Sequence, residues 1–270
     1  MSTSTIATPA VGMRAGEAEA VDRHTGIKQY SLPQILAVWA AVALPMAALA
    51  WLVAPALKDH FAGTGNVPLF KALNVCLTVG LVWQFVLVAS LVWREQRTFR
   101  WSTVREALWL RSPRSPRTGR IGGRIWLVLI PLIVATFIES LLPLAGPKDR
   151  DFGAFIGSDA GKAFLHGAWG WYALMLVWFV FNTVLGEELL FRGWLLPRMN
   201  GVFERKDWLA NGVLFAGYHL HFPWTIPGTL LIDTFAVAYP SKRYRSAWVG
   251  IAVHSAQSVF FAILIFTLVL

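Results

Sequence analysis

The chain of 270 residues is poor in charge and in cysteine. Only 14% of the residues are charged, against about 25% in a typical soluble domain, and 56% are hydrophobic. The single cysteine, Cys76, lies inside an apolar run, so a disulfide framework within the chain is excluded. These shortages exclude an ordinary soluble domain and a small disulfide-stabilised one, and they favour an integral membrane protein.

Acidic residues are also scarce, at 15 against 24 Lys and Arg, and the basic excess is unevenly spread. Nine arginines fall between Arg94 and Arg124, with only two acids among them. Because this block separates two apolar segments, it indicates a cytoplasmic loop that follows the positive-inside rule, not a nucleic-acid interface. We therefore expect the lipid bilayer, including anionic head groups, as a partner and no nucleic acid.

What the chain has in abundance is long apolar runs. We expect a disordered cytoplasmic tail over 1–30 and a single transmembrane domain over 31–270. Runs of this length satisfy their backbone in lipid only as helices, so the fold class is an all-α polytopic membrane bundle of about seven to eight helices. The first run starts too late for a cleaved signal peptide. The expected spans are 32–57, 69–93, 125–145 and 163–185, then a short helical hairpin over 208–222 and 226–239, then 246–270.

The arginine block also sets the expected orientation. With 94–124 in the cytoplasm, the N-terminus is cytoplasmic and the loop 146–162, which has no basic bias, lies outside. The end of the fourth span then lies toward the cytoplasmic side. In a prokaryotic cell the membrane would be the plasma membrane.

Two adjacent acids, Glu187 and Glu188, follow the fourth apolar run. An acid at hydrocarbon depth costs about 2.5–3.5 kcal/mol, so its presence is by default a hypothesis of function. Glu188 and Arg192 are four residues apart and share a helix face, where they can pair. Glu187 has no cation at that spacing, which leaves it free to act as a general base. The alternative is a solvated helix end at the aqueous boundary.

Two later apolar segments each contain a histidine. His219 lies one helical turn after Phe215, and His254 shares a face with Gln257 and Ser258, three and four residues later. The latter three side chains are neutral donors that can hold an oxyanion. The alternatives are a hydrogen-bonded core histidine at 219 and polar contacts between helices around 254.

Taken together, the order Glu-Glu-x-x-x-Arg, Phe-x-x-x-His and His-x-x-x-polar resembles a known family. It is similar to the CAAX-type prenyl endopeptidases and bacteriocin-processing proteins, the CPBP or Abi intramembrane proteases. The resemblance covers about residues 160–265, the expected catalytic core. One position departs from the family pattern: Ser258 stands where the family usually has Asn.

The resemblance implies an endopeptidase that hydrolyses a peptide bond of a membrane-associated or lipidated peptide or protein. Glu187 and His219 would activate the attacking water, and His254 with Ser258 or Gln257 would stabilise the oxyanion. Glu188 would pair with Arg192 and fix the helix.

Zinc is a further expectation to weigh, because the family has been described as metalloproteases. Glu187, His219 and His254 are suitable ligand types for zinc. They come from separate helices, however, and the sequence has no His-Glu-x-x-His pair. Water activated directly by Glu and His is chemically sufficient, so we favour a metal-free site.

Two other classes of function remain open from the sequence. A catalytically silent membrane scaffold or immunity protein would use the same helices without turnover. A transporter or channel would also place acids within the membrane, but it predicts a polar lining through all spans. Glu139 and Asp233, in the third span and the hairpin, are further buried acids that could orient a site residue.

Overall fold

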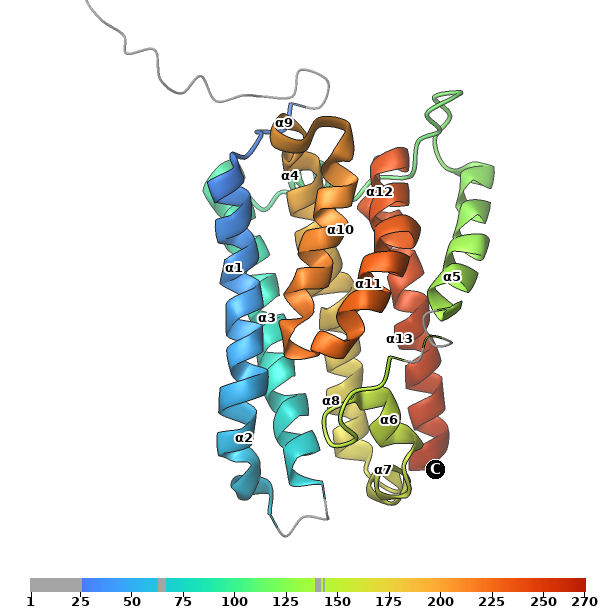
Figure 1. Cartoon of the computed structure of the whole chain (residues 1–270). Coiled ribbons are helices and arrows are strands. Elements are labelled where there is room, and N and C mark those ends of the chain that lie inside the picture. Colours follow the sequence, from blue (N-terminus) through green and yellow to red (C-terminus); the bar gives the residue numbers. More distant parts are fainter. Residues whose placement is uncertain (1–25, 63–66, 139–141, 143) are drawn as a thin grey trace, which may run out of the picture.

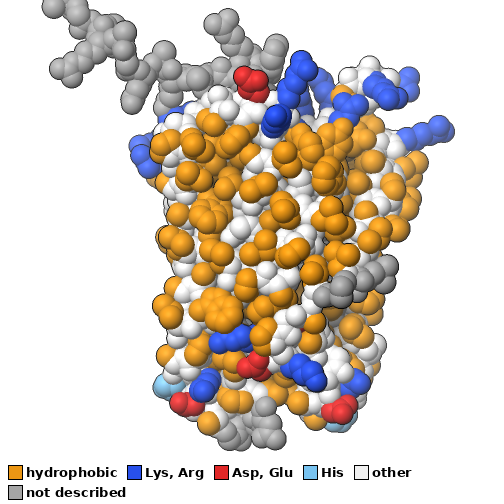
Figure 2. All heavy atoms as spheres, viewed as in Figure 1, with side chains coloured by type: hydrophobic (Ala, Val, Ile, Leu, Met, Phe, Trp, Pro, Cys, Tyr) orange, Lys and Arg blue, Asp and Glu red, His pale blue; other side chains and the backbone are white. Residues whose placement is uncertain are grey.

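The computed structural model describes residues 26–62, 67–138, 142 and 144–270, and within these ranges it contains helices and no strand (Figure 1). The predicted all-α membrane bundle is confirmed. Hydrophobic side chains cover the middle of the face shown in Figure 2, with Lys and Arg at one end and mixed charges at the other. Among the described residues, four helices are long and apolar enough to cross a membrane: Leu32–Phe61, Pro68–Gln96, Trp169–Arg198 and Ala247–Val269.

The first two long helices run antiparallel (Figure 1). The indole Nε1 of Trp83 donates to the carbonyl of Ala41 across them, at 2.8 Å. Residues 1–25 of the predicted tail lie outside the described residues, whereas Gln29 Nε2 donates to the Pro197 carbonyl at 3.0 Å. The elements are α1 (Leu32–Ala48), η1 (Leu49–Val53), α2 (Ala54–Leu57), η2 (Lys58–Phe61), α3 (Pro68–Gln96) and α4 (Trp101–Ala107), where η denotes 3-10 or π turns.

The third predicted span, 125–145, is shorter in the structure. A 3-10 turn, η3 (Gly123–Val128), leads into α5 (Leu129–Phe137), and this apolar helix is too short to cross a membrane alone. Gly146 and Pro147 are poor helix formers, and the chain around them is irregular. Two short helices follow, α6 (Phe152–Gly157) and α7 (Asp159–Leu165), and they lie at the opposite end of the bundle from α4 (Figure 1). Glu139 lies outside the described residues.

The fourth span differs from its prediction at both ends. Gly167, with a φ of +69°, interrupts the helical conformation after α7, so the long helix starts at Trp169 and not at 163. It also continues past 185 to Arg198, because the charges at 187, 188 and 192 are accommodated inside the bundle. Its successive parts are α8 (Trp169–Val180), η5 (Phe181–Gly186), η6 (Leu189–Leu195) and η7 (Leu196–Arg198).

The predicted hairpin is present after this helix. In Figure 1, α10 runs into the bundle and α11 returns toward α12, with Pro223 and Pro227 in and after the turn. The last helix then passes through the whole bundle. The elements are α9 (Asn200–Phe203), η8 (Glu204–Lys206), α10 (Asp207–Tyr218), η9 (His219–His221), η10 (Pro223–Thr225), α11 (Ile226–Asp233), η11 (Thr234–Ala238), α12 (Tyr239–Tyr244) and α13 (Ala247–Val269).

A fully buried arginine, Arg198, fastens the end of the fourth long helix to its neighbours. Its guanidinium makes two hydrogen bonds to Glu95 of α3, at 2.6 and 3.2 Å, and one to the carbonyl of Ala107 in α4, at 3.1 Å. It also stacks on the ring of Trp194, 3.3 Å from the ring centroid. This arrangement fixes the segment that follows the two acids.

The substitution Arg198→Gln is expected to destabilise the protein by about 3–5 kcal/mol, since it leaves Glu95 without its cation in a mostly buried position. The measurement is the unfolding free energy of the purified protein in detergent. The exposed Arg100, at the same end of the bundle, is the matched control, and Arg100→Gln should change stability by less than about 0.5 kcal/mol. Equal effects of the two substitutions would contradict the anchoring role of Arg198.

Candidate active site

The two acids lie within the fourth long helix, between two π-helical stretches. η5 ends at Gly186 and η6 begins at Leu189, so Glu187 and Glu188 stand where the hydrogen-bond register changes. Such π turns often occur at functional sites. Glu187 is 2% exposed and Glu188 is 0% exposed. A solvated helix end is therefore excluded. Glu187 lies roughly 16 Å before Arg198, at about 1.5 Å per helical residue.

The carboxylate of Glu188 contacts two side chains, Arg192 and His254. Its Oε1 lies 3.1 Å from Nη1 of Arg192, so the pair predicted from the i, i+4 spacing is present. The same oxygen accepts a hydrogen bond from Nδ1 of His254, at 3.0 Å, in α13. Sequence reasoning did not anticipate this second contact, which links the fourth long helix to the last one and holds the imidazole of His254 in place.

The backbone of α13 approaches Glu188 closely at Gly250. A Cβ at this position would collide with Oε2 of Glu188 and would lie 2.8 Å from Oγ of Ser241. Only glycine permits so close an approach. Gly250 is one turn before His254 on the same helix, so it sets the distance across which His254 reaches Glu188.

Phe215 of α10 is the centre of the aromatic part of the site. The guanidinium of Arg192 lies 3.9 Å from the ring centroid of Phe215, in a cation–π contact. The rings of His219 and His254 lie 4.9 and 5.9 Å from it, both edge to face. Phe215 therefore brings together the two histidines that sequence spacing placed on separate helices.

Glu187 contacts different partners from Glu188. The hydroxyl of Tyr218 donates a hydrogen bond to its carboxylate. The same hydroxyl accepts a hydrogen bond from Nε2 of Gln84 in α3, at 2.6 Å. Sequence reasoning missed Tyr218 and Gln84, although an amide inside an otherwise apolar span and a tyrosine next to His219 were signals for both.

His219 donates from Nδ1 to the carbonyl of Phe215, at 2.9 Å, when its proton is on that nitrogen. This leaves Nε2 available to a ligand. The ring stacks on His221, 5.3 Å between centroids, and interacts electrostatically with His254 and Arg192. In the described part of the chain no hydrogen bond joins His219 to Glu187, although Phe215 and Tyr218 are neighbours of His219.

The residues expected to assist His254 have different surroundings. Gln257 donates from Nε2 to the carbonyl of Thr136 in α5, at 3.1 Å, so its amide is directed away from the acids. Ser258 is buried one turn after His254. Asp233 of α11 is also buried and interacts electrostatically with His254, Arg192 and Glu188, which places this hairpin acid beside the cluster.

Glu187, His219 and His254 are the side chains predicted to hold zinc if a metal takes part. Over the residues that the structure describes, no three His, Cys, Asp or Glu side chains lie in positions that could hold one ion. The Nδ1 contacts of the two histidines, with a carbonyl and with Glu188, are also usual for metal-ligating histidines and do not bear on this point. In this structure the three side chains are not gathered around one ion position, and the chemistry proposed below uses no metal.

The fold and site together define a polytopic helical membrane protein with a buried cluster of carboxylates, histidines and an arginine. Residues 169–260, from α8 into α13, match the family model described as type II CAAX prenyl endopeptidase Rce1-like. The resemblance noted in the sequence is confirmed for this segment, which is about a third of the chain and contains the whole cluster except Gln84. The match supports the general function of a CAAX-type intramembrane protease.

No curated protein and no solved structure matches this chain.

The ion pair of Glu188 and Arg192 can be tested by a double-mutant cycle. Glu188→Gln and Arg192→Gln should each lower the free energy of unfolding by about 3–5 kcal/mol, because each leaves one buried charge uncompensated. The double variant should lose less than the sum, with a coupling of about 1–3 kcal/mol. Unfolding in detergent gives the values, with exposed Glu204→Gln as control. Strictly additive losses would rule out the pair.

Proposed function

We propose that the protein is an intramembrane endopeptidase that cleaves a peptide bond in a membrane-associated or lipidated peptide or protein. The observation that supports this most is the separation of the two acids. Each carboxylate has one oxygen without a hydrogen-bond partner, but the other oxygen of Glu188 contacts both Arg192 and His254, whereas Glu187 among the described residues is hydrogen-bonded to Tyr218 alone. A buried carboxylate with a free oxygen is suited to bind and activate a water molecule.

In the proposed reaction Glu187 accepts a proton from water as the oxygen attacks the carbonyl carbon of the substrate. His219 contributes through Nε2, which its bond to the Phe215 carbonyl leaves free to position the water. A C–O bond forms, and the carbonyl becomes a tetrahedral oxyanion. Glu187 then returns the proton to the departing nitrogen as the C–N bond breaks, which yields a carboxylic acid and an amine.

His254 is the proposed donor to the oxyanion. Because Glu188 accepts from its Nδ1, Nε2 donates toward the substrate when the ring is the doubly protonated imidazolium, which the adjacent Glu188 carboxylate stabilises. Preorganised donors of this kind contribute about 2.7–4 kcal/mol each in other hydrolases. Ser258 is the second proposed donor, and Gln257 is a poor one because Thr136 already holds its amide.

The proposed access is from the cytoplasmic side, with a cytoplasmic N-terminus. The arginine-rich segment between α3 and α5 lies at the end of the bundle that contains α4, α9 and α12 (Figure 1), where Figure 2 shows the largest group of Lys and Arg side chains. By the positive-inside rule this end faces the cytoplasm.

A second candidate is a catalytically silent membrane scaffold with the same fold. Two observations favour it: Ser258 occupies the position where the family usually has Asn, and Gln257 does not replace it. The scaffold would need the Glu188 ion pair for stability but would have no use for Glu187.

The substitution Glu187→Gln separates the two candidates. Cleavage should fall by about 100-fold or more, because general acid–base catalysis by a positioned carboxylate is lost, while folding persists. Proteoliposomes would be incubated with peptides ending in Cys-aliphatic-aliphatic-X, with and without a farnesyl thioether, and products measured by mass spectrometry. Exposed Glu204→Gln serves as control. Unchanged cleavage by Glu187→Gln contradicts the proposed chemistry, and a wild-type protein that cleaves none of these peptides favours the scaffold.

Metal dependence is tested separately. We expect purified protein to contain far less than one zinc per chain by elemental analysis, and its cleavage rate to survive chelation by 1,10-phenanthroline. The reason is that the described His and acidic side chains are not arranged around a common ion position. Stoichiometric zinc that is lost together with activity would overturn the metal-free proposal.

A further inference from the structure

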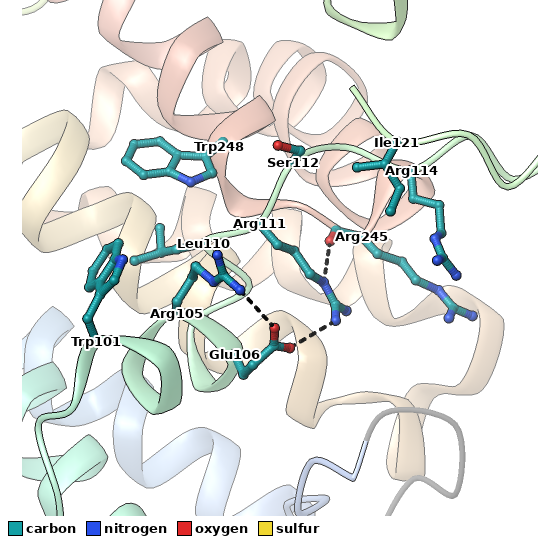
Figure 3. Close-up of a pocket in the computed structure, with 10 residues that line it drawn as sticks. All are labelled: Trp101, Arg105, Glu106, Leu110, Arg111, Ser112, Arg114, Ile121, Arg245 and Trp248. Atoms are coloured by element: carbon teal, nitrogen blue, oxygen red, sulfur yellow. Dashed lines mark hydrogen bonds and ion pairs between the residues drawn. The ribbon is translucent and has the colours of Figure 1, made fainter. Parts of the chain in front are cut away.

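A basic cavity of about 640 Å³ lies outside the catalytic cluster, where α4, the loop after it and the start of α13 meet (Figure 3). Four arginines and two tryptophans dominate its lining: Arg105, Arg111, Arg114, Arg245, Trp101 and Trp248. The mechanism proposed above uses none of these residues. Their gathering from three separate segments indicates a binding site for an anion.

The positive charge of this cavity is only partly neutralised by the protein itself. Glu106 is the one acid in its lining; it lies 3.9 Å from Arg105 and 3.3 Å from Arg111. Within the described ranges, the guanidinium groups of Arg114 and Arg245 have no carboxylate partner. The pKa of Arg111 is lowered by burial, and Arg245 and Arg114 lower it further against the opposing effect of Glu106. A bound anion would relieve this repulsion.

An apolar groove of about 300 Å³ adjoins the basic cavity. The two share Trp101, Leu110 and Trp248 in their linings, so they lie side by side. The rest of the groove is lined by apolar side chains of α3, the α4 segment, the helix that carries the acids, and α13. These include Val88 and Val92 of α3 and Leu185 and Leu189 beside the acids.

The basic cavity and the apolar groove together, called the composite surface below, match a membrane leaflet, in which head groups lie next to acyl chains. The basic cavity lies where α3 has ended at Gln96 and α13 starts at Ala247, at the ends of two candidate membrane spans. The groove lies along those spans. Tryptophans at the junction are typical of the boundary between head groups and acyl chains, where an indole meets both environments.

We propose that this surface binds an anionic phospholipid from the bilayer. Its phosphate lies among Arg111, Arg114 and Arg245, and one acyl chain follows the apolar groove past Trp101 and Trp248. A nucleic acid would have no use for the groove, and a free phosphate ion would fill only the cavity. The site is independent of the proposed peptidase chemistry, so either can fail without the other.

Native mass spectrometry of the full chain in detergent tests this site. Phosphatidylglycerol should bind in preference to phosphatidylcholine with the same acyl chains. Arg114→Gln/Arg245→Gln, which breaks no ion pair, should reduce that preference by about tenfold or more, because each arginine near a head group contributes about 1 kcal/mol. The matched control is Arg117→Gln/Arg120→Gln, which removes the same charge from exposed positions of the same loop outside the cavity.

Two further comparisons separate a lipid from other anions. Ala89→Phe, in the groove, should weaken phosphatidylglycerol binding while all four arginines remain. Glycerol 3-phosphate, which lacks acyl chains, should compete poorly. An equal loss in the Arg117/Arg120 control would show attraction by net charge alone and overturn the site. Full binding by Ala89→Phe, or efficient competition by glycerol 3-phosphate, would overturn the lipid assignment. Thermal unfolding confirms that each variant is folded.

Discussion

The carboxylate of Glu188 is the contact on which the rest of the site depends. It neutralises Arg192 within its own helix and holds the imidazole of His254 from the last helix. Without it, the buried guanidinium would lose its ion-pair partner, and the last helix would lose one of its hydrogen bonds to the fourth. A charged group at this depth is tolerated only because its partners surround it.

The cluster also gives the two adjacent acids different surroundings, as the proposed mechanism requires. Adjacent helical residues point about 100° apart, so Glu187 and Glu188 face different surroundings. Glu188 faces Arg192 and His254, and Glu187 faces Tyr218, whose hydroxyl accepts a hydrogen bond from Gln84. The π turns on either side add to this divergence, since they shift the hydrogen-bond register immediately before and after the pair. Two identical side chains thereby acquire distinct tasks through geometry alone.

Much of this arrangement was predictable from local spacing. Glu188 and Arg192 are one turn apart, and Phe215 and His219 are one turn apart, so each contact follows from helical periodicity. The contacts between helices were not predictable in this way. His254 bonds to Glu188 because Gly250 lets α13 approach, and Gln84 of α3 bonds to Tyr218 at the end of α10, across a large separation in sequence. The extension of the fourth helix to Arg198 was not predicted for a related reason. A hydropathy profile scores a charged residue as unfavourable in a membrane span whether or not its charge is paired.

Gly250 has no functional group, yet the position of His254 depends on it. A methyl group there would collide with the Glu188 carboxylate, so even alanine must displace α13 or tilt the acid. In a genetic screen scored only by loss of activity, this glycine would rank with the residues that perform the chemistry. The site therefore depends on the absence of a side chain at Gly250, where two helices come close together, as well as on its polar side chains.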